Sequence, residues 1–171
     1  MRMILVLCCS VLAVVPSLGA QNTPGAPPRC DAPEYRQFDF WVGEWRVTMG
    51  GQEVGSNSVT LEEAGCLVHE HWTGAKGGTG QSLNFYDRSD GRWHQAWISS
   101  SGGALFLSGS YHDGRLEYTG VRPASPGGPV QRQRLTFFKN ADGTVRQLWE
   151  TSADGVTWQT TFDGLYTRKA P

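Results

Sequence analysis

Short segments of alternating apolar and polar residues dominate the chain from residue 44 onward. They are rich in Val, Thr, Trp, Tyr and Phe and are separated by turn residues, a pattern that predicts β-strands joined by hairpins. We expect about ten of them, at residues 44–49, 54–61, 66–73, 81–86, 92–99, 104–111, 115–121, 130–138, 144–151 and 157–168. A single helical turn is predicted ahead of them at residues 31–38, with Asp31 as its cap and Pro33 in its first turn.

The connections between these segments favour an up-and-down arrangement. Asp-Gly pairs at 90–91, 113–114, 142–143 and 154–155 accept the positive backbone angles of tight hairpin turns. Consecutive antiparallel strands must either close on themselves or leave long edges that invite aggregation. The fold class is therefore predicted to be all-β, an up-and-down antiparallel β-barrel, with a two-sheet sandwich as the alternative.

Composition and charge exclude several classes of protein. The chain contains 22 glycines and 9 prolines, which interrupt it too often for a helical bundle. Its 15 basic and 16 acidic residues leave a formal charge of −1, which provides no surplus to hold a nucleic-acid backbone or an anionic membrane. We therefore expect no nucleic-acid partner.

The N-terminal region has the pattern of an export signal. Arg2 is followed by an uncharged apolar run over residues 3–15 and by small residues up to Ala20. The sequence thus predicts a signal peptide at 1–20, a flexible lead-in at 21–29 and one domain at 30–171. We expect the mature protein to be periplasmic or extracellular, without membrane insertion after the signal is removed.

After that cleavage, Cys30 and Cys66 are the remaining cysteines. Two thiols in an oxidising compartment favour a disulfide. A catalytic dithiol is the alternative, but the pair lacks the close Cys-x-x-Cys spacing of redox centres.

A polar residue followed two positions later by tryptophan recurs in three segments. Because residues i and i+2 of a strand face the same side, each pair shares a face. If these faces point inward, indoles and amide or carboxyl groups line a cavity suited to a small organic ligand. The predicted ligand-binding residues are Glu70, Trp72, Ser82, Asn84, Trp93, Gln95, Trp97, Arg132, Arg134, Gln147 and Trp149.

Other interpretations of this face remain open. The tryptophans and their polar neighbours could form a filled core that only satisfies itself, which would make the barrel structural or inhibitory. Glu70 is costly to bury unless it is paired, and Arg132 or Arg134 is its expected partner. A buried Glu70 also permits acid–base catalysis, as in an isomerase or hydrolase. His69 and His71 have a metal-like spacing, but they are expected on the outer face, so no metal site and no cofactor are predicted.

Residues 38–45, which end in Gly43-Glu44-Trp45 after a predicted helical turn, resemble the signature of the calycin superfamily, which contains the lipocalins. Residues 65–72, 80–87, 93–97 and 154–166 extend a similarity to exported bacterial lipocalin-like proteins, an uncharacterised family. The resemblance implies a calycin-like barrel in which Trp45 plugs the floor beneath a basic residue near the end of the last strand, Arg168 or Lys169, with Gly43, Trp45 and Arg168 in structural roles. Together with the predicted cavity, it favours a small-molecule binding protein whose ligand is unknown.

Overall fold

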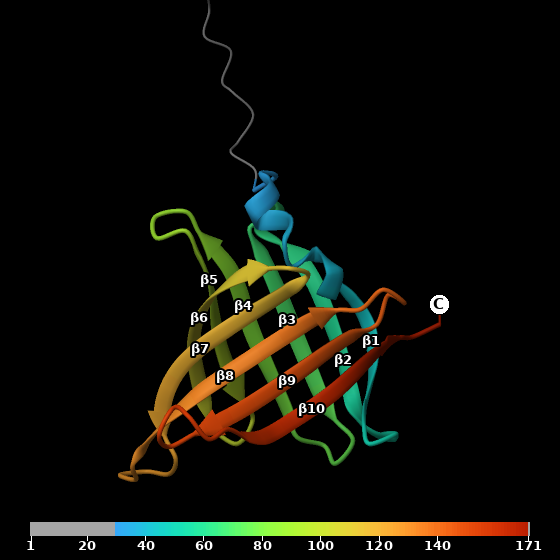
Figure 1. Ribbon diagram of the computed structural model, residues 1–171. Coiled ribbons are helices and arrows are strands. Elements are labelled where there is room, and N and C mark those ends of the chain that lie inside the picture. The colour runs from blue at the N-terminus through green and yellow to red at the C-terminus, as the bar shows by residue number, and fades with distance from the viewer. Residues whose placement is uncertain (1–29, 171) are drawn as a thin grey trace, which may run out of the picture.

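The computed structural model describes residues 30–170. Ten antiparallel strands form one closed barrel in which each strand pairs with its neighbours in sequence and β1 pairs with β10 (Figure 1). The prediction of an up-and-down barrel is therefore confirmed. The strands are β1 Gly43–Met49, β2 Gln52–Glu62, β3 Leu67–Gly74, β4 Thr79–Asp87, β5 Arg92–Ser99, β6 Ala104–His112, β7 Arg115–Pro123, β8 Val130–Lys139, β9 Val145–Ser152 and β10 Gln159–Arg168.

The strands form where the alternation of residues placed them, with ends that differ by two residues or fewer from the expected ones. At the joint between β6 and β7, Asp113 and Gly114 both have positive φ, 49° and 76°. Such angles match the twist of a two-residue hairpin, and Asp and Gly tolerate them better than most residues. The predicted signal peptide and lead-in, residues 1–29, lie outside the described residues.

Three short 3-10 helices, η1 Pro33–Arg36, η2 Asp39–Trp41 and η3 Glu63–Gly65, accompany the strands. The first two replace the single turn predicted at 31–38. The N-cap of η1 is Ala32 rather than Asp31, because the Ala32 carbonyl accepts the Tyr35 N–H and Pro33 begins the turn. None of the helices in residues 30–170 is long and apolar enough to cross a membrane.

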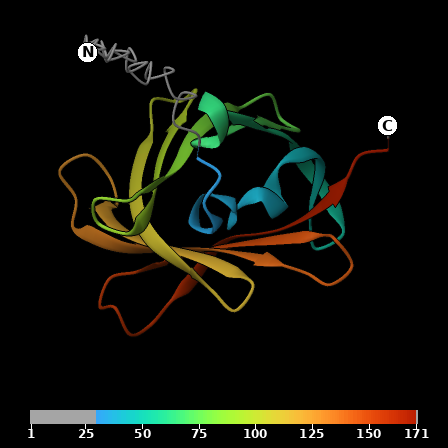
Figure 2. The same cartoon turned by 90° about the horizontal axis from the view of Figure 1, so that it is seen from above.

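The first two helices cover one end of the barrel. Seen from above, η1 and η2 lie inside the ring of strands (Figure 2). A disulfide between Cys30 and Cys66 ties the segment that precedes η1 to the start of β3, which confirms the predicted pairing. The Cys30 N–H also donates to the Ala64 carbonyl. We call this end the capped end; the hairpins β1–β2, β3–β4, β5–β6, β7–β8 and β9–β10 form the opposite end.

The barrel closes through a contact between its first and last strands. Trp45 of β1 is directly opposite Arg168 of β10, and the guanidinium of Arg168 lies 4.4 Å from the indole centroid. Arg168 also donates to the Val42 carbonyl at 3.2 Å. At Gly43, φ is +143° and an added Cβ would come within 2.3 Å of the Arg168 side chain, so a residue without a side chain is required there.

The core is concentrated near the capped end. There, aromatic rings from η2, from the segment between η1 and η2 and from five strands pack together. Phe38 has a ring-centroid distance of 5.0 Å to Trp41 and 4.9 Å to Phe137. We call this cluster the aromatic plug; its members are buried, and they are Phe38, Trp41, Trp45, Trp93, Tyr118, Phe137 and Tyr166. The plug fills the lumen at this end and leaves the other end free to form a site.

Candidate functional site

A cavity of about 230 Å³ occupies the barrel lumen between the aromatic plug and the hairpin end. Its walls are mostly apolar, with three polar side chains among them. The lining residues are Glu70, Trp72, Gln95, Trp97, Leu105, Leu135, Gln147, Trp149, Phe162 and Tyr166. A second hollow shares Trp72, Trp97 and Phe162 with this cavity and extends over residues of the β3–β4 and β5–β6 hairpins.

The indoles of Trp72 and Trp97 lie against the barrel wall because each packs on a glycine of the adjacent strand. A Cβ added to Gly55 would come within 2.6 Å of the Trp72 ring. A Cβ added to Gly80 would come within 2.2 Å of the Trp97 ring. Both glycines lie on strands adjacent to the tryptophan concerned. The indoles therefore rest on bare backbone instead of crossing the lumen, and the hollow stays open.

Glu70 is the acidic group of the cavity. It lies on β3 with 4% of its surface exposed. Its carboxylate accepts hydrogen bonds from Asn57 Nδ2 at 2.9 Å and from Ser82 Oγ at 2.6 Å. Burial raises the pKa of Glu70 to about 7, and the two hydrogen bonds, with a smaller contribution from His69, only partly oppose this shift. Near neutral pH the group is thus poised between its two protonation states.

A hydrogen-bond chain connects Glu70 to the neighbouring strands. Asn84 Nδ2 donates to Ser82 Oγ at 2.8 Å, and Gln95 Nε2 donates to Asn84 Oδ1 at 2.8 Å. The Tyr118 hydroxyl also donates a hydrogen bond to Asn84 Oδ1, at 3.3 Å. The chain runs from β2 to β7 and fixes the orientation of both Glu70 and Gln95 at the inner end of the cavity.

Two further cavity residues are held from the other side of the barrel. The Tyr166 hydroxyl donates to Gln147 Oε1, and Trp149 Nε1 donates to Gln133 Oε1 at 2.9 Å. The pKa of the Tyr166 phenol is raised well above its ordinary value, first by burial and then by the nearby Glu70. Tyr166 is therefore a neutral hydroxyl at physiological pH.

The predicted site residues separate into four groups. The cavity lining contains six of them, namely Glu70, Trp72, Gln95, Trp97, Gln147 and Trp149. Ser82 and Asn84 are buried and support Glu70 and Gln95. Trp93 faces inward but belongs to the aromatic plug, where its indole donates to Gln37 Oε1 at 3.0 Å. Arg132 and Arg134 form the fourth group, outside the lumen.

The expectation that Arg132 or Arg134 pairs with Glu70 is wrong. On β8 the inward positions are Gln133, Leu135 and Phe137, so the two arginines face outward. Arg134 donates to Glu150 at 2.9 Å, and its guanidinium lies 4.1 Å from the Trp158 ring centroid. Arg132 lies close to Gly155 in the β9–β10 hairpin. The prediction that the arginines of β8 face inward was based on charge pairing with Glu70. The alternation of the apolar residues Leu135 and Phe137 indicated the correct inward face.

Sequence reasoning did not identify the remaining lining residues. Leu105, Leu135, Phe162 and Tyr166 were not predicted, nor was Asn57, which binds Glu70. Leu105 and Leu135 share strand faces with other buried apolar residues, a signal that was available. Phe162 was harder to place, because a register shift between Thr160 and Phe162 interrupts the alternation of β10.

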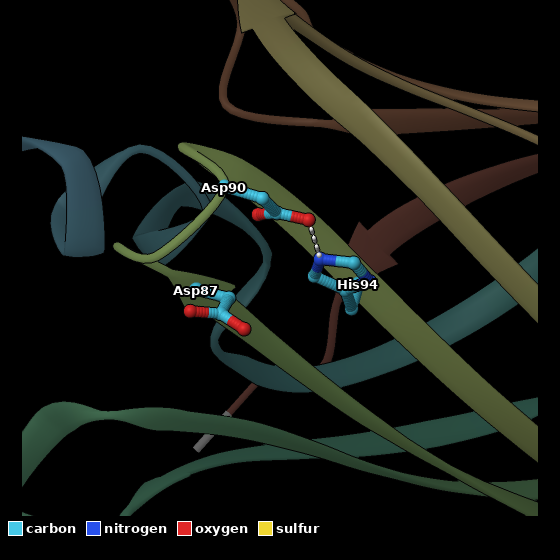
Figure 3. Close-up of side chains that lie close together, drawn as sticks. All are labelled: Asp87, Asp90 and His94. Carbon is cyan, nitrogen blue, oxygen red and sulfur yellow. Dashed lines mark hydrogen bonds and ion pairs between the residues drawn. The ribbon is translucent and has the colours of Figure 1, made fainter.

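The histidines lie away from the cavity. His69 and His71 are on the outer face of β3 with ring centroids 4.1 Å apart, and His69 contacts Glu62 and Gln81. At the β4–β5 turn, Asp87, Asp90 and His94 have potential ligand atoms within 4.8 Å of one another (Figure 3). Hydrogen bonds within the turn explain why these three side chains lie close together. Asp87 accepts the Ser89 N–H, while Asp90 accepts the Arg92 N–H and binds His94 Nε2 at 3.0 Å.

The closed barrel of ten antiparallel strands, with its buried aromatic cluster, is compatible with a binding barrel and with a calycin-like fold. No protein-family model matches the chain, and no curated protein matches it in sequence. The cavity is therefore the feature of this molecule that bears on its function.

Proposed function

We propose that this protein is an exported, lipocalin-like carrier of a small organic ligand held in the open half of its barrel. The observation that carries the proposal is the cavity of about 230 Å³ with apolar aromatic walls and three polar side chains, Glu70, Gln95 and Gln147. A concave, mostly apolar site with a few convergent polar groups is typical of small-molecule pockets. Its size suits a compact ligand, since cavities of about 150 Å³ already accept benzene.

Two features outside the cavity support the calycin likeness and export. Arg168 covers Trp45 beside Gly43, as the resemblance to calycins implies. The Cys30–Cys66 disulfide suits an oxidising compartment and agrees with the signal-like pattern of residues 1–20. Both features bear on where the protein works and how it is built, while the cavity bears on what it does.

Calorimetric titration of the mature protein with a panel of aromatic compounds tests the carrier proposal. We expect at least one compound of about ten non-hydrogen atoms to bind, in line with the ligand sizes that such cavities accept. Leu135→Trp should abolish that binding by filling the cavity, whereas Leu165→Trp, on the exposed outer face of β10, should not. A panel without any binder, or binding that survives Leu135→Trp unchanged, contradicts the proposal.

A second candidate function, an enzyme of the isomerase or hydrolase type, is favoured by one observation. Glu70 opens into the cavity and has a pKa of about 7, which is where a general acid or base is most effective at neutral pH. The bound panel compounds would be incubated with wild-type protein and with Glu70→Gln. Conversion by the wild type alone supports an enzyme, and recovery of unchanged ligand from both contradicts it.

A further inference from the structure

Glu70 faces the cavity without a cation to neutralise it. The ten lining residues include one carboxyl group and no lysine, arginine or histidine. The direct partners of the carboxylate are the neutral side chains of Asn57 from β2 and Ser82 from β4. A buried carboxylate is costly to ionise unless an opposite charge compensates it.

The other titratable groups around Glu70 do not supply that charge. Tyr118 of β7 and Tyr166 of β10 are buried phenols whose pKa values burial raises well above normal, so they stay neutral. His69 is adjacent on β3 but points to the outer face, where it contacts Glu62 and Gln81. Arg134, the expected partner, is bound to Glu150 outside the barrel. Arg122 of β7 lies 5.4 Å from the ring centroid of Trp149 at the cavity wall, but it forms no ion pair with Glu70. Within residues 30–170, the carboxylate is therefore left to be compensated from the cavity.

The rest of the cavity is also suited to a positive charge. Trp72, Trp97, Trp149 and Phe162 surround the space that Glu70 faces. Trp72 and Phe162 meet at nearly a right angle, 89°, with centroids 6.2 Å apart, and so form a corner of aromatic walls. The indoles of Trp72 and Trp97 rest on Gly55 and Gly80, an arrangement that keeps them out of the centre of the lumen. Aromatic faces attract cations, and tryptophan does so most strongly.

We propose that the ligand is a small organic ammonium ion, held between the Glu70 carboxylate and the indole faces of the cavity. This inference rests on the proposed carrier function and specifies its ligand class. The volume of about 230 Å³ has room for one aromatic ring with a short aminoalkyl chain. Gln95 of β5 and Gln147 of β9 also line the cavity, on different sides of the barrel, and provide hydrogen-bonding groups for a further polar atom of the ligand.

Binding of such a cation is coupled to the protonation of Glu70. An ammonium ion requires the ionised carboxylate, whose pKa in the free protein is about 7. Binding near neutral pH therefore releases a proton, and affinity rises with pH until Glu70 is fully ionised. From this linkage we expect an affinity about tenfold higher at about pH 8 than at about pH 6.

The test compares three probes that share one phenyl ring and differ in charge: 2-phenylethylamine, 2-phenylethanol and phenylacetate. Calorimetry on the mature protein near neutral pH should show the amine binding about tenfold more tightly than the alcohol, as expected for a compensated buried charge. Phenylacetate should not bind detectably. Titrations in buffers of different ionisation enthalpy should show proton release with the amine and none with the alcohol.

Variants localise the charge preference. Glu70→Gln keeps the shape of the side chain and should remove both the preference for the amine and the proton release. Glu117→Gln, on the outward-facing side of β7, is the matched control and should leave both unchanged. Thermal melts of each variant establish that it is folded, and the comparison of the three probes on the wild type stands even if Glu70→Gln does not fold.

The outcomes separate this inference from the carrier proposal. Equal or tighter binding of the alcohol or of phenylacetate overturns the cation assignment and leaves the carrier function standing. A preference for the amine that persists in folded Glu70→Gln also overturns it, because the charge would then lie elsewhere. If none of the three probes binds, the cation assignment fails, and the carrier proposal then depends on the wider panel described above.

Discussion

The two halves of the barrel lumen contain the same kinds of side chain and use them in opposite ways. In the capped half, Phe38 and Trp41 enter the lumen from outside the sheet and stack with strand residues until the interior is full. In the open half, Trp72 and Trp97 lie against glycines of the adjacent strands, and the space between them stays empty. Aromatic content alone therefore does not determine whether a barrel has a cavity. What decides it is the residue beneath each ring and the presence of a segment that plugs the lumen.

The largest expected effect on stability comes from removing a ring from the filled half. Phe137 is fully buried and contacts Phe38, Trp41 and Tyr118. Phe137→Ala should lower the free energy of unfolding by about 4 kcal/mol, the typical cost of such a cavity. Trp97→Ala should cost only about 2 kcal/mol, because one face of the indole already borders a void and has fewer contacts to lose.

Denaturant unfolding with an unchanged m-value measures both free energies. Equal losses for Phe137→Ala and Trp97→Ala would contradict the distinction between the halves. Ligand binding should show the reverse order, with Trp97→Ala more damaging than any variant of the plug that remains folded.

Protonation of Glu70 gives the next largest effect and is specific to the open half. Its pKa rises from 4.5 to about 7 on folding, so between these values the folded protein holds a proton that the unfolded chain has lost. The contribution of Glu70 to stability is therefore fully present below about pH 4.5 and is lost as the pH rises through about 7, a change of about 3 kcal/mol.

Unfolding free energies measured across this pH range, for the wild type and for Glu70→Gln, check the prediction. The variant should lack this component of the decline. Two results would show that Glu70 is ionised in the folded protein without penalty. One is a wild-type free energy of unfolding that rises over the same pH interval, and the other is a decline of equal size in Glu70→Gln. An added ammonium ligand should reduce the decline, because it stabilises the ionised form.

The sequence predicted the barrel well because its signals are local. Alternation, Asp-Gly turns and the closure argument require no knowledge of distant contacts, and they located all ten strands. The inward face was also predicted correctly on β3, β5 and β9, where a polar residue and a tryptophan mark it together.

The site was harder to predict because a residue belongs to it only if it faces the lumen and also lies at the right position along the barrel axis. Trp93 and Trp97 share one face of β5, yet the first belongs to the plug and the second lines the cavity, because Phe38 reaches only the capped end. Nothing near Trp93 in the sequence reports that contact. The glycines that hold the cavity open were equally hidden, since Gly80 acts across a strand pair on Trp97.

The smallest stability effect should come from a single methyl group, and it tests the role of those glycines directly. A Cβ at position 80 would come within 2.2 Å of the Trp97 ring, so in Gly80→Ala the indole must move toward the lumen. We expect a stability cost of about 1 to 2 kcal/mol, within the usual range for overpacking, together with a large loss of ligand affinity. Gly78→Ala, in the same β3–β4 hairpin but with open space around its Cβ position, is the matched control and should bind as the wild type does. If Gly80→Ala binds as tightly as Gly78→Ala, the cavity does not depend on indoles resting on glycine, and the contrast between the two halves must have another origin.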